Sequence, residues 1–259
     1  MGDANDEDAL LHRNPCLDHD YWIAQTPTSV AQFRQFVESS GYPGHAAECL
    51  QYPENRPVCW VSWHDALAFC AWLTERWRKT LPAGWRVSLP SEAEWEKAAR
   101  GGEQIPLEIQ ATTAAKGFAP AASAMRDNPS PQREYPWGSD WAPDSSNAEM
   151  NVGNASSPGC FETGRSPYAC EDMAGNLWEW TRSLWGKDWG KPEFTYPYLP
   201  DDRKREDLRA GNDVLRLVRG GSWSYNRAYA RCAVRSRLSP RQPQPRPRFS
   251  GGVAFCPCS

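Results

Sequence analysis

A pair of glycines between an apolar strand pattern and an aromatic, arginine-rich run constrains this sequence most. Leu217 and Val218 have the pattern of the end of a buried strand, and Gly220 and Gly221 follow closely. Two adjacent glycines predict a tight bend, because glycine takes positive φ at little cost. In residues 223–229, large rings alternate with small or polar side chains. Such a mixture is typical of a recognition surface, and the alternative is a hairpin whose rings simply face the core.

The composition predicts much irregular backbone. The 259 residues include 14 Trp, 23 Pro and 19 Gly, which favours short strands and loops packed around aromatic rings over a helical bundle. The net charge of −3 gives no indication of a nucleic-acid or anionic-membrane partner. Since no run of about 18 apolar residues occurs, we expect no membrane span. A chain of this length has enough residues to bury a core.

The two ends differ in composition from the middle. Residues 1–19 are charged and aperiodic, which predicts a flexible leader, and residues 241–259 form a tail rich in Pro and Arg. Between them, residues 20–240 predict a single domain. The nine cysteines are an odd number, and no apolar signal segment opens the sequence. We therefore expect a cytoplasmic protein with free thiols, although display at a cell surface stays open.

Local patterns predict an α+β fold with short twisted strands, few helices and much loop. Serines precede three segments of helical apolar period, which predicts helices beginning after Ser29, Ser62 and Ser91. The first ends near Ser40 and the third near Arg100. Short apolar runs predict strands at 21–24, 59–61, 85–89 and 177–181. Residues 104–131 indicate a marginal helix or mobile insertion, and residues 187–212 a long polar loop.

Five short runs occur in a characteristic order: PVCWVSW at 57–63, LPSEAEWE at 89–96, YPWG at 135–138, DMAGNLWEW at 172–180 and RGGSW at 219–223. The ordered set resembles the formylglycine-generating enzyme, or sulfatase-modifying-factor, superfamily. This resemblance covers about residues 20–237 and implies a C-type-lectin-like fold. It does not by itself fix the function, because one fold supports many activities.

The oxidase members of that superfamily hold copper with two cysteine thiolates. Their cysteines lie in a segment that resembles residues 223–235 of this chain. Here the first position corresponds to about Tyr225, the second falls near residues 228–230, and Cys232 is the only thiol. Because soft thiolates are the ligands that suit Cu(I), one thiol does not make that site. The resemblance therefore implies no catalytic residues and no copper.

A second branch of the superfamily contains iron-dependent sulfoxide synthases whose iron lies on three histidines. This chain has only four histidines and no HxxxHxE spacing. They are His12, His19, His45 and His64. We therefore expect no iron.

A third branch comprises the variable proteins of diversity-generating retroelements, which are not enzymes and display a hypervariable face on the same fold. Residues 222–237 resemble their variable region. The resemblance implies a ligand-binding face made of Trp223, Ser224, Tyr225, Ala228, Tyr229, Val234, Ser236, Leu238 and Ser239. Scaffold positions alternate with the displayed ones: Trp223, Arg231, Ala233, Arg235 and Arg237. The expected partner is a protein or cell-surface ligand. An oxidoreductase of either enzyme type, or an interaction domain without diversification, remains the alternative.

The run at 172–180 also resembles a calcium loop of the oxidases. The resemblance implies side-chain oxygens from Asp172 and Glu179, with backbone carbonyls from Met173, Gly175 and Leu177. Calcium prefers such hard oxygen ligands. The alternative is a tight loop held by its own hydrogen bonds.

The tail departs from the family's ending, which is a strand. Prolines at 240, 243, 245 and 247 disfavour a central strand here. Codons permitted for residues 240–257, regrouped one base later, can spell PDNRNRDLGFRVVLP, which resembles the usual ending. We hypothesise a frameshift, natural or from sequencing. The fold then lacks its final strand, and Cys256 and Cys258 carry no evolved chemistry.

Overall fold

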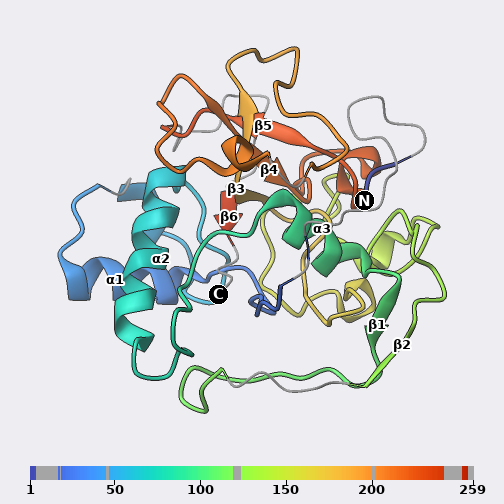
Figure 1. Cartoon of the computed structure of the whole chain (residues 1–259), viewed down its shortest axis with the longest axis horizontal. Helices are drawn as coiled ribbons and strands as arrows, with labels where there is room; N and C mark the ends of the chain where they lie inside the picture. The colour runs from blue at the N-terminus through green and yellow to red at the C-terminus, as the bar shows by residue number, and fades with distance from the viewer. Residues whose placement is uncertain are drawn as a thin grey trace.

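The computed structural model describes residues 1–3, 17, 19–44, 47–118, 124–199, 202–241 and 253–255. Its centre is a four-stranded sheet in the order β5-β4-β3-β6 (Figure 1). The strands are β3 (Trp178–Gly186), β4 (Leu215–Arg219), β5 (Ser236–Leu238) and β6 (Val253–Phe255). β4 pairs antiparallel with both β3 and β5, whereas β6 runs parallel to β3. Two further strands, β1 (Gln104–Pro106) and β2 (Met125–Asp127), pair separately.

Three α-helices flank the sheet. α1 (Val30–Ser40) and α2 (Trp63–Trp77) pack together on one side of the view, and α3 (Glu92–Arg100) lies on the other, against β3 and β4 (Figure 1). Single 3₁₀ turns occur at η1 (Ala47–Leu50), η2 (Pro143–Ser145), η3 (Glu162–Gly164), η4 (Arg203–Glu206) and η5 (Arg227–Ala230). The architecture is α+β, as predicted. None of the helices in the described part of the chain has the length and apolarity to span a membrane.

The three predicted helix starts are confirmed. Ser29, Ser62 and Ser91 each accept a hydrogen bond from the backbone N–H three residues later, and the side chain at that third position bonds back to the serine N–H. These reciprocal capping boxes satisfy N–H groups that a helix start otherwise leaves open. Gly41, with φ of 64°, ends α1.

Three of the predicted strands are wrong. Segments 21–24, 59–61 and 85–89 form no named strand. Cys59, Val61, Val87 and Leu89 are buried all the same, whereas residues 21–24 are only half-buried. An apolar run therefore does not by itself predict a strand. At Trp60, for example, the backbone has a φ of 62°, which lies outside the extended region. The strand predicted at 177–181 is confirmed and extends to Gly186.

The insertion and both termini also differ from expectation. The described part of 104–131 holds β1 and β2 and no helix. Within the leader, Gly2 donates to the Glu96 Oε1 at 2.7 Å and accepts from Arg100 at 2.6 Å, so residues 1–3 are held in place. The tail does supply a strand, β6, beside residues 178–180. It lies after the prolines and at a sheet edge, so they do not block it.

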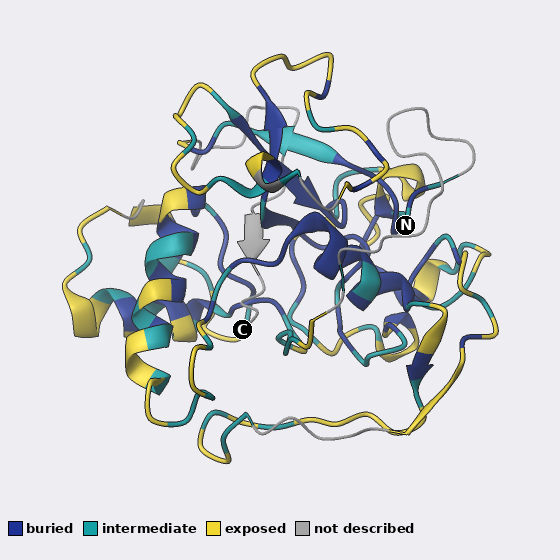
Figure 2. Cartoon of the chain, in the orientation of Figure 1, coloured by how far each residue is buried: buried dark blue, intermediate teal, exposed yellow. Residues whose placement is uncertain are grey.

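The core lies between the inner faces of α1 and α2 and the sheet (Figure 2). Phe33 and Phe36 of α1 meet Phe69 of α2 with ring centroids 5.3–5.8 Å apart. Val218 and Trp180 close this cluster from the sheet side. Because these side chains are almost completely buried, they account for much of the hydrophobic stabilisation that fixes the sheet.

α3 carries three buried glutamates, and each has an arginine partner from a distant segment. The pairs are Glu92 with Arg235 at 2.8 Å, Glu94 with Arg182 at 2.7 Å, and Glu96 with Arg219 at 2.6 Å. Buried charges are tolerated only when they are paired and hydrogen-bonded. The helix therefore ties together β3, β4 and the segment that follows the glycine pair.

Candidate ligand-binding site

The glycine pair redirects the chain as β4 ends. Gly220 and Gly221 have φ values of 94° and 80°. A Cβ on Gly221 would lie 2.8 Å from the Tyr229 carbonyl oxygen, so a larger residue would displace η5. The Gly220 carbonyl accepts from the Gly175 N–H at 2.7 Å. The bend that the two glycines predict is therefore present. It lies between the Gly175 backbone and the Tyr229 carbonyl.

Three aromatic rings form the centre of the surface after the bend. Trp178 of β3 is buried, and the Tyr225 ring meets it edge-on at 5.7 Å. The Tyr229 ring lies 5.0 Å from Tyr225 and 6.4 Å from Trp178. Tyr225 is half-buried, and this burial raises its pKa above the usual value. Tyr229, in contrast, is 43% exposed. The result is a rigid ring cluster, buried at its base and exposed at its outer edge.

A second loop borders this surface. The Glu149 N–H donates to the Tyr225 carbonyl and the Met150 N–H to the Trp223 carbonyl, each at 2.8 Å. Arg227 forms an ion pair with the Glu149 carboxylate at 3.1 Å. Met150 is 62% exposed, so it adds apolar surface beside the rings. No sequence pattern predicts this pairing, because about 75 residues separate the two segments.

The structure exposes some predicted face residues and buries one. Ala228 and Tyr229 are exposed on η5, whereas Trp223 is half-buried beside Leu177. The other half-buried positions are Ser224, Tyr225, Ser236, Leu238 and Ser239. Val234 is only 9% exposed and packs in the main core cluster, so its side chain does not contribute to the outer surface.

The predicted scaffold positions make contacts that hold the surface. Arg235 is buried and pairs with Glu92, and the Arg237 guanidinium lies 4.6 Å from the Trp185 ring centroid. Arg231 donates to the Ala228 carbonyl and to Asp3. These arginines point to partners within the protein, so they position the neighbouring side chains.

The predicted calcium loop contains two buried carboxyls. Asn176 donates to the Asp172 carboxylate at 3.0 Å, and the Trp95 Nε1 donates to Glu179 Oε2 at 2.8 Å. Glu179 Oε1 is buried and has no hydrogen-bond partner among the described residues. Burial raises the pKa of Asp172 to about 7, and burial together with the Asp172 charge raises that of Glu179 to about 8.

This loop is joined directly to the surface, because the Trp223 N–H donates to the Asn176 carbonyl at 2.9 Å. Its donor set also fits a calcium ion. Two carboxylates with no arginine or lysine partner among the described residues, and an orphaned buried oxygen, are what a hard cation would complete. Of the predicted ligands, Met173 and Leu177 are buried side chains that offer only carbonyls, and Gly175 has a φ of 78°.

The cysteine and the histidines weighed above as copper or iron ligands have other surroundings where the structure describes them. Cys232 is completely buried, and burial raises the pKa of its thiol to about 12. His19 contacts Glu94, and His64 contacts Asn212. Over the part of the chain that the structure describes, no three His, Cys, Asp or Glu side chains are grouped for a metal. His12 and His45, like Cys256 and Cys258, lie outside the described residues.

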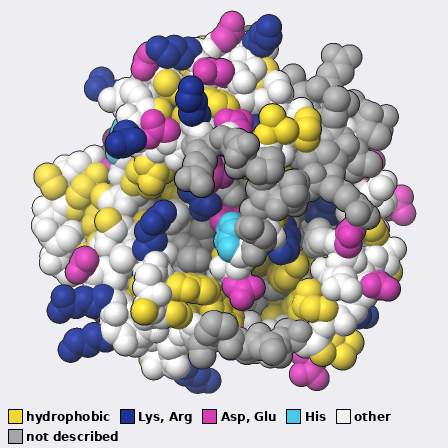
Figure 3. All heavy atoms as spheres, viewed as in Figure 1, with side chains coloured by type: hydrophobic (Ala, Val, Ile, Leu, Met, Phe, Trp, Pro, Cys, Tyr) yellow, Lys and Arg dark blue, Asp and Glu magenta, His cyan; other side chains and the backbone are white. Residues whose placement is uncertain are grey.

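On the face seen in Figure 3, acidic and basic side chains are interspersed, with no wide patch of one sign. Such a surface does not attract polyanions strongly.

Comparisons with known proteins place these features in one family. Over 216 residues the chain is 27% identical to the mouse formylglycine-generating enzyme, covering 77% of this chain and 44% of that protein. It is 28% identical to the hercynine oxygenase of Mycolicibacterium thermoresistibile, covering 78% and 44% respectively. The chain thus spans less than half the length of these relatives.

Among solved structures, Treponema denticola variable protein 1 superposes with a TM-score of 0.64 at 19% identity. The match covers 99% of this chain and 90% of that one. The likeness shows a shared fold, which is the C-type-lectin-like architecture predicted from the sequence. The Sulfatase-modifying factor enzyme 1-like domain matches residues 1–249, and the chain therefore belongs to that family.

Proposed function

We propose that this chain is a ligand-binding variable protein of a diversity-generating retroelement, and that it binds a protein or cell-surface ligand without catalysis. The observation that carries the proposal is the ring cluster of Trp178, Tyr225 and Tyr229. Its base is buried in the core and its outer edge is exposed. Tyrosine supplies large contact area at low entropic cost, which suits recognition of a protein surface.

The scaffold supports variation at the displayed positions. The backbone of 223–225 is held by hydrogen bonds to Asn176, Glu149 and Met150, which do not depend on the side chains displayed. Arg235 and Arg219 anchor the flanking segments to α3. Side chains between these anchors can therefore change while the backbone keeps its position. The proposed face comprises Ser224, Tyr225, Ala228, Tyr229, Ser236, Leu238 and Ser239. It omits the buried Val234, and it omits Trp223, which packs beside Leu177 and is treated as a scaffold position.

The single thiol weighs against oxidation of a cysteine substrate. Copper would need two thiolates, whereas Tyr225 stands at the first position and the raised pKa of Cys232 keeps that thiol protonated. In an oxygen-electrode assay with added copper and a cysteine peptide, we expect no oxygen uptake above that of the peptide and copper alone. Uptake that requires the protein would favour the oxidoreductase alternative.

We also propose a structural calcium ion in the loop 172–179. Asp172 and Glu179 would supply carboxylate oxygens, and Met173, Gly175 and Leu177 backbone carbonyls. The support is the orphaned Glu179 Oε1, together with the buried Asp172 carboxyl, which accepts from Asn176 but has no arginine or lysine partner among the described residues. Since Asn176 of this loop accepts from Trp223, the ion would stiffen the support of the surface.

Sequencing of many gene copies from a population of cells tests the retroelement assignment. We expect substitutions to gather in adenine-containing codons of the proposed face and to be scarce at Trp223, Arg231 and Arg235. The codons for residues 84–103 around α3 serve as the control, because that stretch has the same length as residues 220–239. An equal density of substitutions in both stretches would contradict the proposal.

A further inference from the structure

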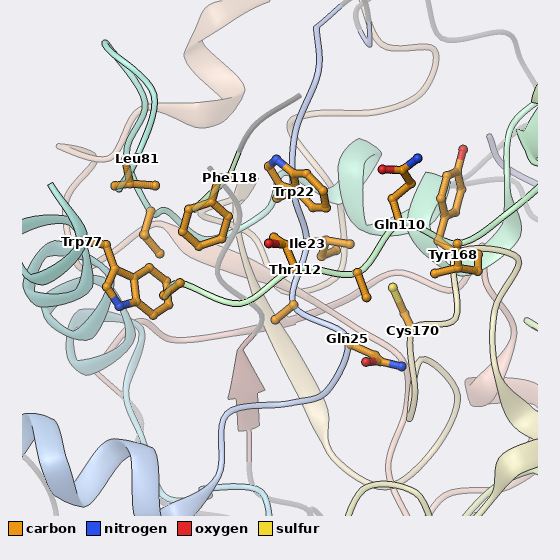
Figure 4. A pocket seen from close by; sticks show the side chains of 15 residues that line it. Trp22, Ile23, Gln25, Trp77, Leu81, Gln110, Thr112, Phe118, Tyr168 and Cys170 are labelled. Carbon is orange, nitrogen blue, oxygen red and sulfur yellow. The ribbon is translucent and has the colours of Figure 1, made fainter. Parts of the chain in front are cut away.

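A cavity of about 220 Å³ lies away from the proposed face (Figure 4). Four segments build its wall: residues 22–25, the end of α2 with the loop to Val87, residues 109–118, and the turn at 168–170. No residue of 223–239 takes part. The floor residue Cys170 packs against Met173 in a small buried cluster. The cavity is therefore a separate feature of the fold that neither the calcium loop nor the ring cluster uses.

Aromatic rings dominate one end of this cavity. The Phe118 ring lies 5.5 Å from Trp77 and 6.4 Å from Trp22, tilted or edge-on to each. Leu81 lies at the same end, as Figure 4 shows. Rings at such angles present both faces and edges to the cavity, which favours another aromatic ring packed against them.

Polar groups gather at the other end, where Figure 4 places Gln25, Gln110 and Tyr168. The side-chain amides of the two glutamines hydrogen-bond to none of the described residues. All fifteen lining residues are uncharged. An ionised ligand would gain no counter-charge from these described lining residues, so the wall favours an uncharged ligand. A few polar groups in a mostly apolar wall are the usual composition of a small-molecule site.

From this wall we infer that the cavity binds a small, uncharged ligand of two fused aromatic rings that carries one polar group. The size supports two rings, because an apolar cavity of about 150 Å³ accommodates benzene and this one is larger. The rings lie among Trp22, Trp77 and Phe118, and the polar group faces the glutamines. This site is independent of the proposed protein ligand.

Isothermal titration calorimetry with 2-naphthol, an uncharged probe of this shape, tests the inference on the full chain. We expect one site per chain with a Kd below about 1 mM. The variant Ala114→Phe places a ring in the cavity and weakens binding at least about tenfold. The matched control Ala115→Phe changes the exposed neighbour, which does not line the cavity, and leaves binding unchanged. The anionic analogue 2-naphthoate binds at least about tenfold more weakly than 2-naphthol.

Three outcomes overturn the inference: no saturable binding of 2-naphthol, equal weakening by both alanine variants, or equal affinity for the anion. Thermal unfolding of each variant is measured in parallel, so that loss of binding through unfolding is recognised. If Ala114→Phe does not fold, a second variant and a second measurement take its place. The variant is Thr112→Leu, which removes a hydroxyl from the wall. The measurement is the change in chemical shift at the Trp22 and Trp77 indoles. Unchanged indole shifts with 2-naphthol then refute the site.

Discussion

The Arg219 guanidinium donates to the Glu96 carboxylate at 2.6 Å, and both side chains are buried. Arg219 is the last residue of β4, so the contact fixes the chain to α3 immediately before the glycine pair. Arg235 binds Glu92 one helical turn away on the same helix. The part of the proposed face in residues 224–229 is therefore attached to α3 both before and after it.

The first prediction concerns this anchor. Replacing Arg219 with alanine leaves Glu96 with fewer partners in the interior, and we expect a loss of about 3–5 kcal/mol in the free energy of unfolding. Arg209 is 93% exposed and pairs with Asp207, so Arg209→Ala should change the free energy of unfolding by less than about 0.5 kcal/mol. Urea unfolding of both variants measures the difference. Similar losses in the two would contradict the anchoring role.

The second prediction concerns acid. Burial of Glu94 opposes ionisation, yet hydrogen bonds from His19 and Arg182 and the Arg182 charge lower its pKa from 4.5 to about 2. A carboxyl with a lowered pKa stabilises the fold above the unfolded value, and the contribution disappears as the pH falls through the folded value. Between pH 5 and 2, the wild type should lose roughly 3 kcal/mol more than Glu94→Gln.

Urea midpoints measured at each pH test this. The exposed Glu38 makes no ion pair among the described residues, so Glu38→Gln should follow the wild-type curve. Parallel curves for Glu94→Gln and the wild type would show that Glu94 is not the group responsible.

The third prediction concerns calcium. Calcium at 100 times its Kd should raise the free energy of unfolding by about 2.7 kcal/mol, and magnesium should raise it less. Glu179→Gln should abolish the increase, since the loop then loses a carboxylate. Thermal unfolding with and without each ion measures both effects. An increase that survives in Glu179→Gln would place any calcium elsewhere.

The fourth prediction separates displayed from supporting rings. Trp178 is 3% exposed, and truncation to alanine should cost about 3–5 kcal/mol. Tyr229 is 43% exposed, and Tyr229→Ala should cost less than about 1 kcal/mol. Urea unfolding of both variants measures the two losses. Equal losses of unfolding free energy in Trp178→Ala and Tyr229→Ala would make Tyr229 a core residue and not a display position.

The sequence predicted the helices and the glycine bend because their signals are local. A serine cap acts over three residues, and Gly221 can take a positive φ because it lacks a Cβ. The apolar runs at 59–61 and 85–89 predict strands because such runs indicate burial. A segment becomes a strand only when a second segment of the chain lies alongside and hydrogen-bonds to it. That neighbour is set by tertiary contacts.

The same reason limited prediction of the site. The ordered motifs identified the superfamily and the rings after the glycine pair. The pairing of Glu149 and Met150 with the backbone of 223–225 joins segments distant in sequence, and no composition signals it. The alternation of scaffold and displayed positions assigns Val234 to the displayed face. The chain turns at residues 231–234, and the Val234 side chain packs in the main core cluster.

Selection from a randomised display library tests the central claim most directly. One library varies Ser224, Tyr225, Ala228 and Tyr229, and a matched library varies Gln35, Glu38, Ser39 and Ser40, exposed positions of α1. Both are selected for binding to hen lysozyme, and folding is monitored by display level. We predict folded members of the first library with Kd below about 1 µM, and none from the second. Loss of folding in the first library, or equal recovery of binders from both, would contradict the account.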